Sequence, residues 1–128
     1  MLYYDKINAG KISKEDTLLY KSNAYEAGAG DVTLKYKAGS YIPYSVLLEE
    51  LIIDSDNTAN NILIGNIGYS KYRYEIAKYS DRELSSKFYN SNVTCPAFSF
   101  DVIKYLYKHS DEYSELIENM KKSSYGKY

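Results

Sequence analysis

The middle of the chain holds the feature that most constrains its fold, a polar segment between two apolar runs. Val46–Ile53 precedes the segment Ser55-Asp56-Asn57, and Ile62–Ile67 follows it. In both runs the apolar residues recur at helical spacing, and in the first they wrap most of the helix surface. Buried polar groups cost free energy unless they are hydrogen-bonded. The sequence therefore predicts two buried helices whose polar junction is either a helix cap or a functional site.

Helical spacing also recurs outside these runs. Further helices are expected at Leu2–Ile7, at Lys71–Tyr79, from Pro96 onward, and after a cap at Ser110 or Asp111. The segment Val32–Lys37 alternates with a period of two and is expected to be extended, whereas Asp81–Asn92 is polar and turn-like. The pattern predicts an all-α fold with at most one short extended strip, organised as a single helical domain over residues 1–128.

The helix at Val46–Ile53 is expected to be the most buried one, because its apolar faces need cover on several sides. The candidates for that cover are the helix at Ile62–Ile67 and the helix at Phe98–Tyr107. These three helices are expected to form the core.

The composition is that of a globular chain, and it excludes several classes of function. Of 128 residues, 45% are hydrophobic and 26% are charged, with 16 basic and 17 acidic residues mixed along the chain. A net charge of −1 gives no basic field for nucleic acid. The single cysteine excludes an internal disulfide, and no apolar run reaches the ~18 residues that cross a membrane. The 17 tyrosines are expected at half-buried positions, with a carbohydrate- or aromatic-binding surface as the alternative.

Several segments occur in an order that resembles one protein family. They are Gly28-Ala29-Gly30, Lys37-Ala38-Gly39-Ser40, Leu47–Ile52, Ser55-Asp56-Asn57-Thr58-Ala59 and Leu63–Gly68. Their order is similar to that in the helical half of the penicillin-recognising serine hydrolases, which are the class A β-lactamases and their D,D-peptidase-like relatives. The resemblance implies the helical subdomain of the β-lactamase/transpeptidase-like fold.

The resemblance also implies a role for each polar residue of the motif. Ser55 would relay a proton to the leaving nitrogen, because a hydroxyl both donates and accepts. Asn57 would hold the substrate's side-chain amide and the family's catalytic lysine, since its amide offers both bond types. Asp56 would point inward and accept backbone N–H groups. The alternative is that Asp56 or Asn57 merely caps the helix that begins near Thr58, and both interpretations can hold together.

Two catalytic elements of the family are missing from their expected places. The family's nucleophile lies in a Ser-x-x-Lys motif upstream of Ser-Asp-Asn, and its third element is a Lys-Thr-Gly strand. No Lys-Thr-Gly occurs here, and Ser124-Tyr125-Gly126-Lys127 lies downstream, where a chance match is expected. By the resemblance, Met1 follows the nucleophile motif and Tyr128 precedes the Lys-Thr-Gly strand. The chain is therefore expected to be an excised or incomplete helical subdomain, inactive by itself.

Asp81 is a candidate for the residue that activates the hydrolytic water. Class A β-lactamases carry a Glu two residues before a Glu-Leu pair, and Asp81 stands at that place before Glu83-Leu84. An Asp is one methylene shorter and would hold the water poorly. The alternative is a solvated turn charge. This departure favours a peptidase-like or acyl-trapping relative over an enzyme with full β-lactamase turnover.

No metal or cofactor is expected. The alternating oxygens from Asp54 to Asn60 resemble an EF-hand loop, but Ala59 replaces its Gly and Gly65 its bidentate Glu. The partners implied by the resemblance are a β-lactam or a peptidoglycan peptide, bound by the complete parent, and the missing α/β half of the same fold. The resemblance further implies a bacterial protein of the cell envelope or the exterior.

Two functions of different classes stay open. The first is a subdomain of a serine hydrolase that acts on β-lactams or peptidoglycan stem peptides. The second is a non-catalytic helical module that binds a wall ligand or a protein partner, as a sensor does. A Ser-x-x-Lys upstream of Met1 and a Lys-Thr-Gly beyond Tyr128 in one reading frame would establish the first.

Overall fold

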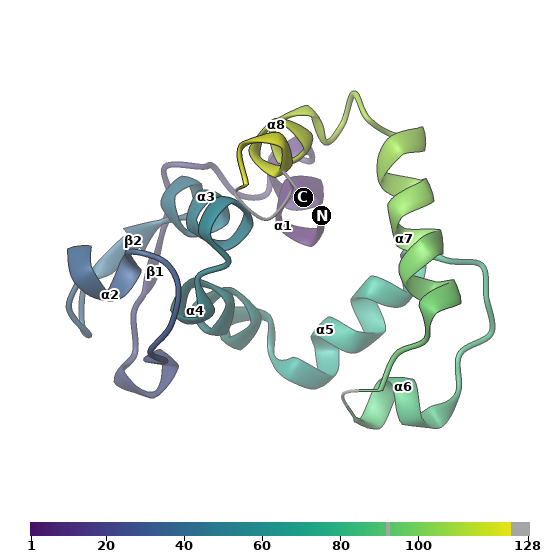
Figure 1. The fold of residues 1–128 in the computed structure, drawn as a ribbon, viewed down its shortest axis with the longest axis horizontal. Coiled ribbons are helices and arrows are strands. Elements are labelled where there is room, and N and C mark those ends of the chain that lie inside the picture. The colour runs from purple at the N-terminus through teal and green to yellow at the C-terminus, as the bar shows by residue number, and fades with distance from the viewer. Residues whose placement is uncertain (92, 124–128) are drawn as a thin grey trace.

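The computed structural model describes residues 1–91 and 93–123. Its elements are α1 (Leu2–Asn8), β1 (Thr17–Leu19), the 3-10 helix η1 (Ser22–Ala24), α2 (Val32–Lys35), β2 (Tyr41–Pro43), α3 (Tyr44–Asp54), α4 (Asn57–Ile67), α5 (Tyr69–Ile76), the 3-10 helix η2 (Ala77–Tyr79), α6 (Ser86–Asn90), α7 (Pro96–Lys108) and α8 (Ser114–Lys122). Figure 1 shows the sheet with α2, α3 and α4 on one side and α5, α6 and α7 on the other, with α1 and α8 between them. The all-α prediction is confirmed, since the described residues add only a two-stranded sheet to the helices. The motif Ser124-Tyr125-Gly126-Lys127 lies outside the described residues.

The sheet joins two segments that flank α2 in the sequence. Its antiparallel register pairs Thr17 with Pro43, Leu18 with Ile42 and Leu19 with Tyr41. The extended strip expected at Val32–Lys37 is wrong, because a helical turn, α2, forms there instead. The carboxylates of Glu50 and Asp56 accept hydrogen bonds from the amides of Asp31 and Val32 at the start of this turn. Acceptors supplied by distant residues thus stabilise the turn against its alternating local pattern.

Helix α3 lies in the core, as expected, and Leu47 is fully buried on it. Helix α4 packs against α3, which confirms one of the two expected neighbours. The other expectation is wrong, because α8 and not α7 packs on α3. Figure 1 shows α7 at the right of the molecule and α3 at the left. There α7 packs against η2. Leu51 is only half-buried, so burial within α3 is less uniform than its sequence suggested.

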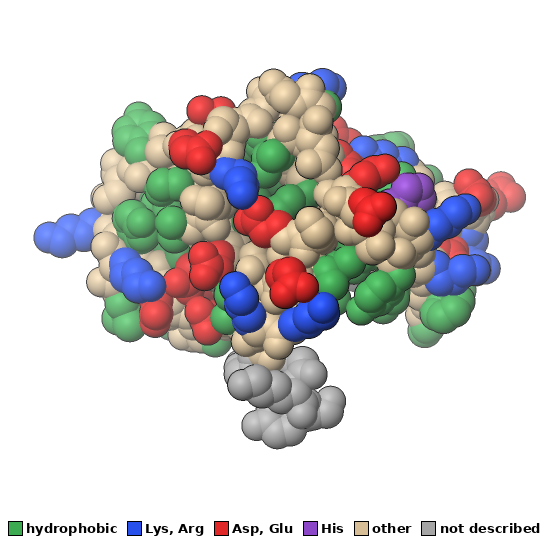
Figure 2. Space-filling model, turned by 90° about the horizontal axis from the view of Figure 1, so that it is seen from above, with side chains coloured by type: hydrophobic (Ala, Val, Ile, Leu, Met, Phe, Trp, Pro, Cys, Tyr) green, Lys and Arg blue, Asp and Glu red, His purple; other side chains and the backbone are tan. Residues whose placement is uncertain are grey.

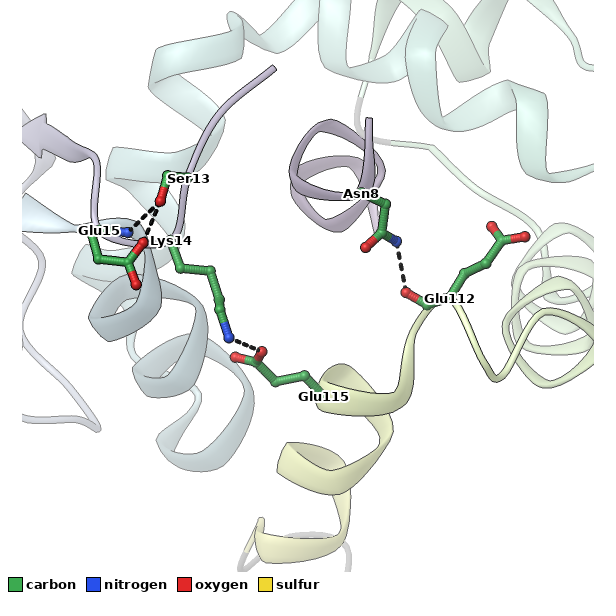
Figure 3. Close-up of polar contacts among 6 residues, drawn as sticks. All are labelled: Asn8, Ser13, Lys14, Glu15, Glu112 and Glu115. Carbon is green, nitrogen blue, oxygen red and sulfur yellow. Dashed lines mark hydrogen bonds and ion pairs between the residues drawn. The ribbon is translucent and has the colours of Figure 1, made fainter. Parts of the chain in front are cut away.

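Two polar contacts fix α8 beside the start of the chain. The Lys14 ammonium lies 2.7 Å from a carboxylate oxygen of Glu115, and the side-chain amide of Asn8 donates to the carbonyl of Glu112 at 2.8 Å (Figure 3). The helix begins after Tyr113, so the cap expected at Ser110 or Asp111 is wrong. The residues before Tyr113 form turns instead, in which the amides of Glu112 and Tyr113 donate to the carbonyls of His109 and Ser110. Tyr113 itself is almost fully buried.

A buried arginine organises α6, which forms inside the segment expected to be turn-like. The Arg73 Nε donates to the carbonyl of Phe88 at 2.8 Å, and its Nη2 donates to the carbonyl of Val93. The guanidinium also lies 4.1 Å from the centre of the Phe88 ring, which packs edge-on against Phe98. Because a buried cation needs such compensation, these contacts fix α6 in place. The turn-like prediction for Asp81–Asn92 is therefore wrong at Ser86–Asn90.

Asp5 anchors α1 to the rest of the fold. Its two carboxylate oxygens accept hydrogen bonds from the hydroxyls of Tyr79 and Tyr113, and Lys78 lies 3.1 Å away. Several other tyrosines are buried with their rings in the core. Tyrosine therefore serves here as an apolar body with a polar tip, while Tyr25 and Tyr74 are exposed.

The surface mixes both signs of charge. Figure 2 shows acidic and basic side chains interspersed on one face, with apolar side chains between them. Within the described residues, no helix combines the length and apolarity needed to cross a membrane.

Candidate functional site

The junction of α3 and α4 is built by a left-handed residue. Helix α3 ends at Asp54, and Ser55 adopts φ 53° and ψ 40°. Among the described residues, Ser55 is the one non-glycine with a positive φ. Such a conformation is uncommon for a residue with a Cβ and costs about 1–2 kcal/mol. The turn that it makes leaves the Ser55 side chain exposed, directly before the start of α4.

Asp56 occupies the N-cap position of α4 and is buried, with only 2% of its surface exposed. One carboxylate oxygen accepts from the amide of Ala59 at 2.8 Å, and the other accepts from the amide of Val32 at 3.0 Å. The first contact is an ordinary helix cap. The second joins the start of α4 to the first residue of α2, so the side chain does more than cap its own helix.

Asn57 lies beside a glycine segment that borders the motif. A Cβ added to Gly28 would lie 2.6 Å from Asn57 Nδ2, and one added to Gly30 would lie 2.1 Å from Asp56 Oδ2. Gly30 also has φ 97°, which favours glycine. At Gly28 and Gly30 the backbone can approach the motif this closely only because neither residue has a Cβ. It forms one wall of the candidate site, and Asn57 is half-buried against it.

Helix α4 holds the same loop at two further points. Thr58 is fully buried, and its hydroxyl bonds both the amide and the carbonyl of Glu26 at 3.0 Å. The side-chain amide of Asn61 donates to the carbonyl of Ala24 at 3.1 Å and to the Glu26 carboxylate at 2.9 Å. No role for Thr58 or Asn61 follows from the local sequence pattern. Their helical spacing on one face of α4, facing a glycine-rich loop, is the signal that could have indicated these contacts.

Asp81 lies apart from this junction. It is exposed in the loop after η2 and lines a shallow groove with Ser80, Arg82 and Asp101. Arg82 and Ser80 both bond the carboxylate of Asp101, and these hydrogen bonds hold the pKa of Asp101 below its usual value. The 3-10 helix η2 packs against α7, which Figure 1 shows on the side opposite α3 and α4. The structure therefore does not bring Asp81 to Ser55 or Asn57, and a catalytic role for it stays a prediction.

An apolar cavity of about 500 Å³ lies beside the amino end of α1. Its walls come from α1, α3, α4, α5, α7 and α8, and include Leu51, Leu63 and Val102. No group of three or more His, Cys, Asp or Glu side chains that could hold a metal occurs among residues 1–91 and 93–123.

The comparison with protein families decides which family this architecture represents. Residues 1–127 match the profile of the Beta-lactamase enzyme family. The chain belongs to this family. The family match confirms the resemblance to the penicillin-recognising serine hydrolases that the sequence indicated. Among curated protein sequences, none matches the chain.

Solved structures show that this β-lactamase-family chain has the helical half of the fold. A β-lactamase from Sphaerobacter thermophilus aligns with a TM-score of 0.72 and 22% identity, covering 95% of this chain and 50% of its own. PBP-A aligns with a TM-score of 0.76 and 15% identity, covering 95% and 49%. The D-alanyl-D-alanine carboxypeptidase DacD from Francisella tularensis aligns with a TM-score of 0.55 and 16% identity, covering 88% and 30%. The chain thus spans about half the length, or less, of these solved relatives.

Proposed function

We propose that this chain is the helical half of a penicillin-recognising serine hydrolase and supplies its Ser-Asp-Asn element. Residues 1–128 would act as one helical domain of that enzyme. The proposed substrates are β-lactams or peptidoglycan stem peptides. A variant of PBP-A is known as an acyl-enzyme complex with penicillin G, which supports the first of these classes.

The observation that carries this proposal is a difference in burial among the three motif residues. Asp56 is buried, and both of its oxygens are used by backbone amides. A helix cap requires this residue alone. Ser55 is exposed and Asn57 is half-buried beside Gly28, so their polar groups are available at the edge of the domain. A hydroxyl and an amide held at one turn by a buried carboxylate suit a site better than a cap.

The proposed roles follow from the chemistry of the two available groups. The Ser55 hydroxyl both accepts and donates, so it can pass a proton to the leaving nitrogen. The Asn57 amide can accept from a substrate N–H while it donates to a substrate carbonyl. Its position against residues 28–30 would fix the direction of that amide.

The nucleophile and the Lys-Thr-Gly element would come from outside these residues. Met1 borders the apolar cavity together with Leu63, so a preceding segment that carries the nucleophile would join the domain beside this cavity. The missing α/β half would close the site over Ser55 and Asn57. The proposed place of the complete enzyme is the bacterial cell envelope or the exterior.

The first test uses the isolated chain. After incubation of residues 1–128 with benzylpenicillin, intact-protein mass spectrometry should detect no penicilloyl adduct. An ordinary serine without an activating base is a weak nucleophile. A stoichiometric adduct would contradict the proposal that the nucleophile lies elsewhere.

The second test places the chain in a complete enzyme. Residues 1–128 would replace the matching helical half of PBP-A, and acylation by benzylpenicillin would be measured. Ser55→Ala should slow acylation on the order of 100-fold by removing the proton relay, and Asn57→Ala should slow it by removing a substrate contact. Ser114→Ala and Asn90→Ala, at exposed positions, are the matched controls. Full acylation in both motif variants would favour the non-catalytic binding module instead.

A further inference from the structure

Glu50 is a buried acid that the Ser-Asp-Asn motif does not explain. It lies on α3, five residues before Ser55, and only 7% of its surface is exposed. One carboxylate oxygen accepts from the amide of Asp31 at 3.2 Å, and the other lies 3.3 Å from the Lys35 ammonium. Because a buried carboxylate is costly without such partners, these contacts account for its burial.

The contacts of Glu50 complement those of Asp56. The amides of Asp31 and Val32 are adjacent, and each donates to a carboxylate from a different part of the chain. Amides at the start of a helical turn lack partners within the turn and favour negative charge. The backbone carbonyl of Glu50 also accepts from the amide of Asp56 at 3.2 Å. Glu50 therefore contacts both the loop, through its side chain, and the motif, through its backbone.

We propose that Glu50 is a positioning residue of the candidate site. Together with Asp56 it holds the loop backbone of residues 28–32 against Asn57, and so sets the space around the Asn57 amide. A Cβ at Gly28 would come within 2.6 Å of Asn57 Nδ2, so a small displacement of the loop changes that space. The consequence for substrate binding rests on the proposed function, whereas the positioning itself does not.

Lys35 contributes little to the position of the loop, although it lies close to Glu50. Its ammonium lies 3.3 Å from Glu50 and 3.6 Å from Asp31, but more than half of the side chain is exposed. Ion pairs of this exposure contribute little, because water and salt screen them. The backbone hydrogen bond of Asp31 is therefore the contact that the test must follow.

The test measures amide hydrogen exchange by NMR in residues 1–128, without any β-lactam. Glu50→Leu keeps the bulk and the helix preference of the side chain but removes the acceptor. It should raise the exchange rate of the Asp31 amide about tenfold or more and shift the side-chain amide signal of Asn57. Glu50→Gln keeps an acceptor oxygen and should leave the Asp31 rate within about threefold of wild type. Glu49→Leu, at the exposed neighbouring position, is the matched control and should change neither signal.

Several outcomes would overturn the proposal. They are an unchanged Asp31 exchange rate in a folded Glu50→Leu chain, a loss of protection in Glu50→Gln equal to that in Glu50→Leu, or an equal Asn57 shift in Glu49→Leu. Where Glu50→Leu does not fold, Glu50→Asp replaces it, because the shorter side chain withdraws the acceptor and keeps the charge. Glu50→Asp should also speed exchange of the Asp31 amide and shift the Asn57 side-chain signal. A wild-type exchange rate and signal in this variant would contradict the proposal. Since no substrate is used, failure of the proposed enzymatic function leaves this result intact.

Discussion

The carboxylate of Asp56 accepts a hydrogen bond from the amide of Val32 at 3.0 Å, across 24 residues of sequence. This bond joins the N-cap of α4 to the first residue of α2, while the other oxygen of Asp56 caps α4 at the Ala59 amide. Both bonds lie in a buried setting. The motif is thus held by its central residue, and the flanking Ser55 and Asn57 are left for other contacts.

Truncation of Asp56 should destabilise the chain more than truncation of its neighbours. Asp56→Ala leaves two buried amides without acceptors and should lower the free energy of unfolding by ~1–3 kcal/mol per unsatisfied group. Ser55→Ala should change it by no more than about 0.5 kcal/mol, because the hydroxyl is exposed. Urea denaturation of the three chains measures the difference. Unfolding by Ser55→Ala with no effect of Asp56→Ala would reverse the assigned roles.

The glycine segment can be tested by a pair of matched substitutions. Gly30 and Gly39 have nearly equal φ values, 97° and 95°, but only the Cβ of Gly30→Ala would meet a neighbour, Asp56 Oδ2 at 2.1 Å. Gly39→Ala should therefore report backbone strain alone, about 1–2 kcal/mol. Gly30→Ala should cost at least ~1 kcal/mol more, because the buried carboxylate must move. If chemical denaturation gives equal losses in the free energy of unfolding for the two variants, the loop moves to accept the new Cβ and Asp56 keeps its position.

Two leucines of α3 should respond differently to truncation. Leu47 is fully buried, so Leu47→Ala should cost ~2–5 kcal/mol through lost burial and the cavity left behind. Leu51 is half-buried and already borders the apolar cavity, so Leu51→Ala should cost roughly 1–2 kcal/mol. The denaturant midpoints of the two variants show which substitution costs more stability. A larger loss at Leu51 would mean that the cavity is closed in solution.

The sequence predicted the elements whose cause is local. The apolar spacing of Val46–Ile53 and Ile62–Ile67 gave α3 and α4, and Pro96 correctly began α7. It could not predict α2 or α6, because their causes are distant in sequence. Carboxylates on α3 and α4 stabilise the first, and the buried Arg73 fixes the second.

In the candidate site, too, features with a local cause were predictable from the sequence and contacts with distant residues were not. The Ser-Asp-Asn motif was visible as a polar interruption of apolar helices. The contacts that hold the loop beside it come from Glu50, Thr58 and Asn61. Each is an ordinary helix residue by its local pattern, and only the fold brings the loop to its side chain. Long-range hydrogen bonds of this kind leave no period in a sequence.

The anchor of α1 should make stability depend on pH. Burial by itself would raise the pKa of Asp5, but hydrogen bonds from Tyr113, Tyr79 and Lys78 hold it below its usual value of 3.8. A carboxylate whose pKa is lower in the folded state contributes stability above its unfolded pKa. That contribution is lost as the pH falls through the folded pKa. Asp5→Asn should therefore be less stable than wild type at pH about 6, with the difference shrinking as the pH falls below about 4.

Urea denaturation between pH about 3 and about 7 measures this dependence. Asp111→Asn removes a carboxylate at an exposed position and is the matched control, for which a small and nearly constant difference is expected. The hydroxyls of Tyr79 and Tyr113 stay protonated throughout this range, because burial raises the pKa of each. Of these three side chains, Asp5 is thus the one that titrates there. Burial also lowers the pKa of the nearby Met1 amino group to about 6, so the Asp5 contribution is read from the acidic end of the range. A difference between wild type and Asp5→Asn that stays constant as the pH falls would mean that the two hydroxyls bond the protonated and the ionised carboxyl equally well, and that the anchor does not depend on charge.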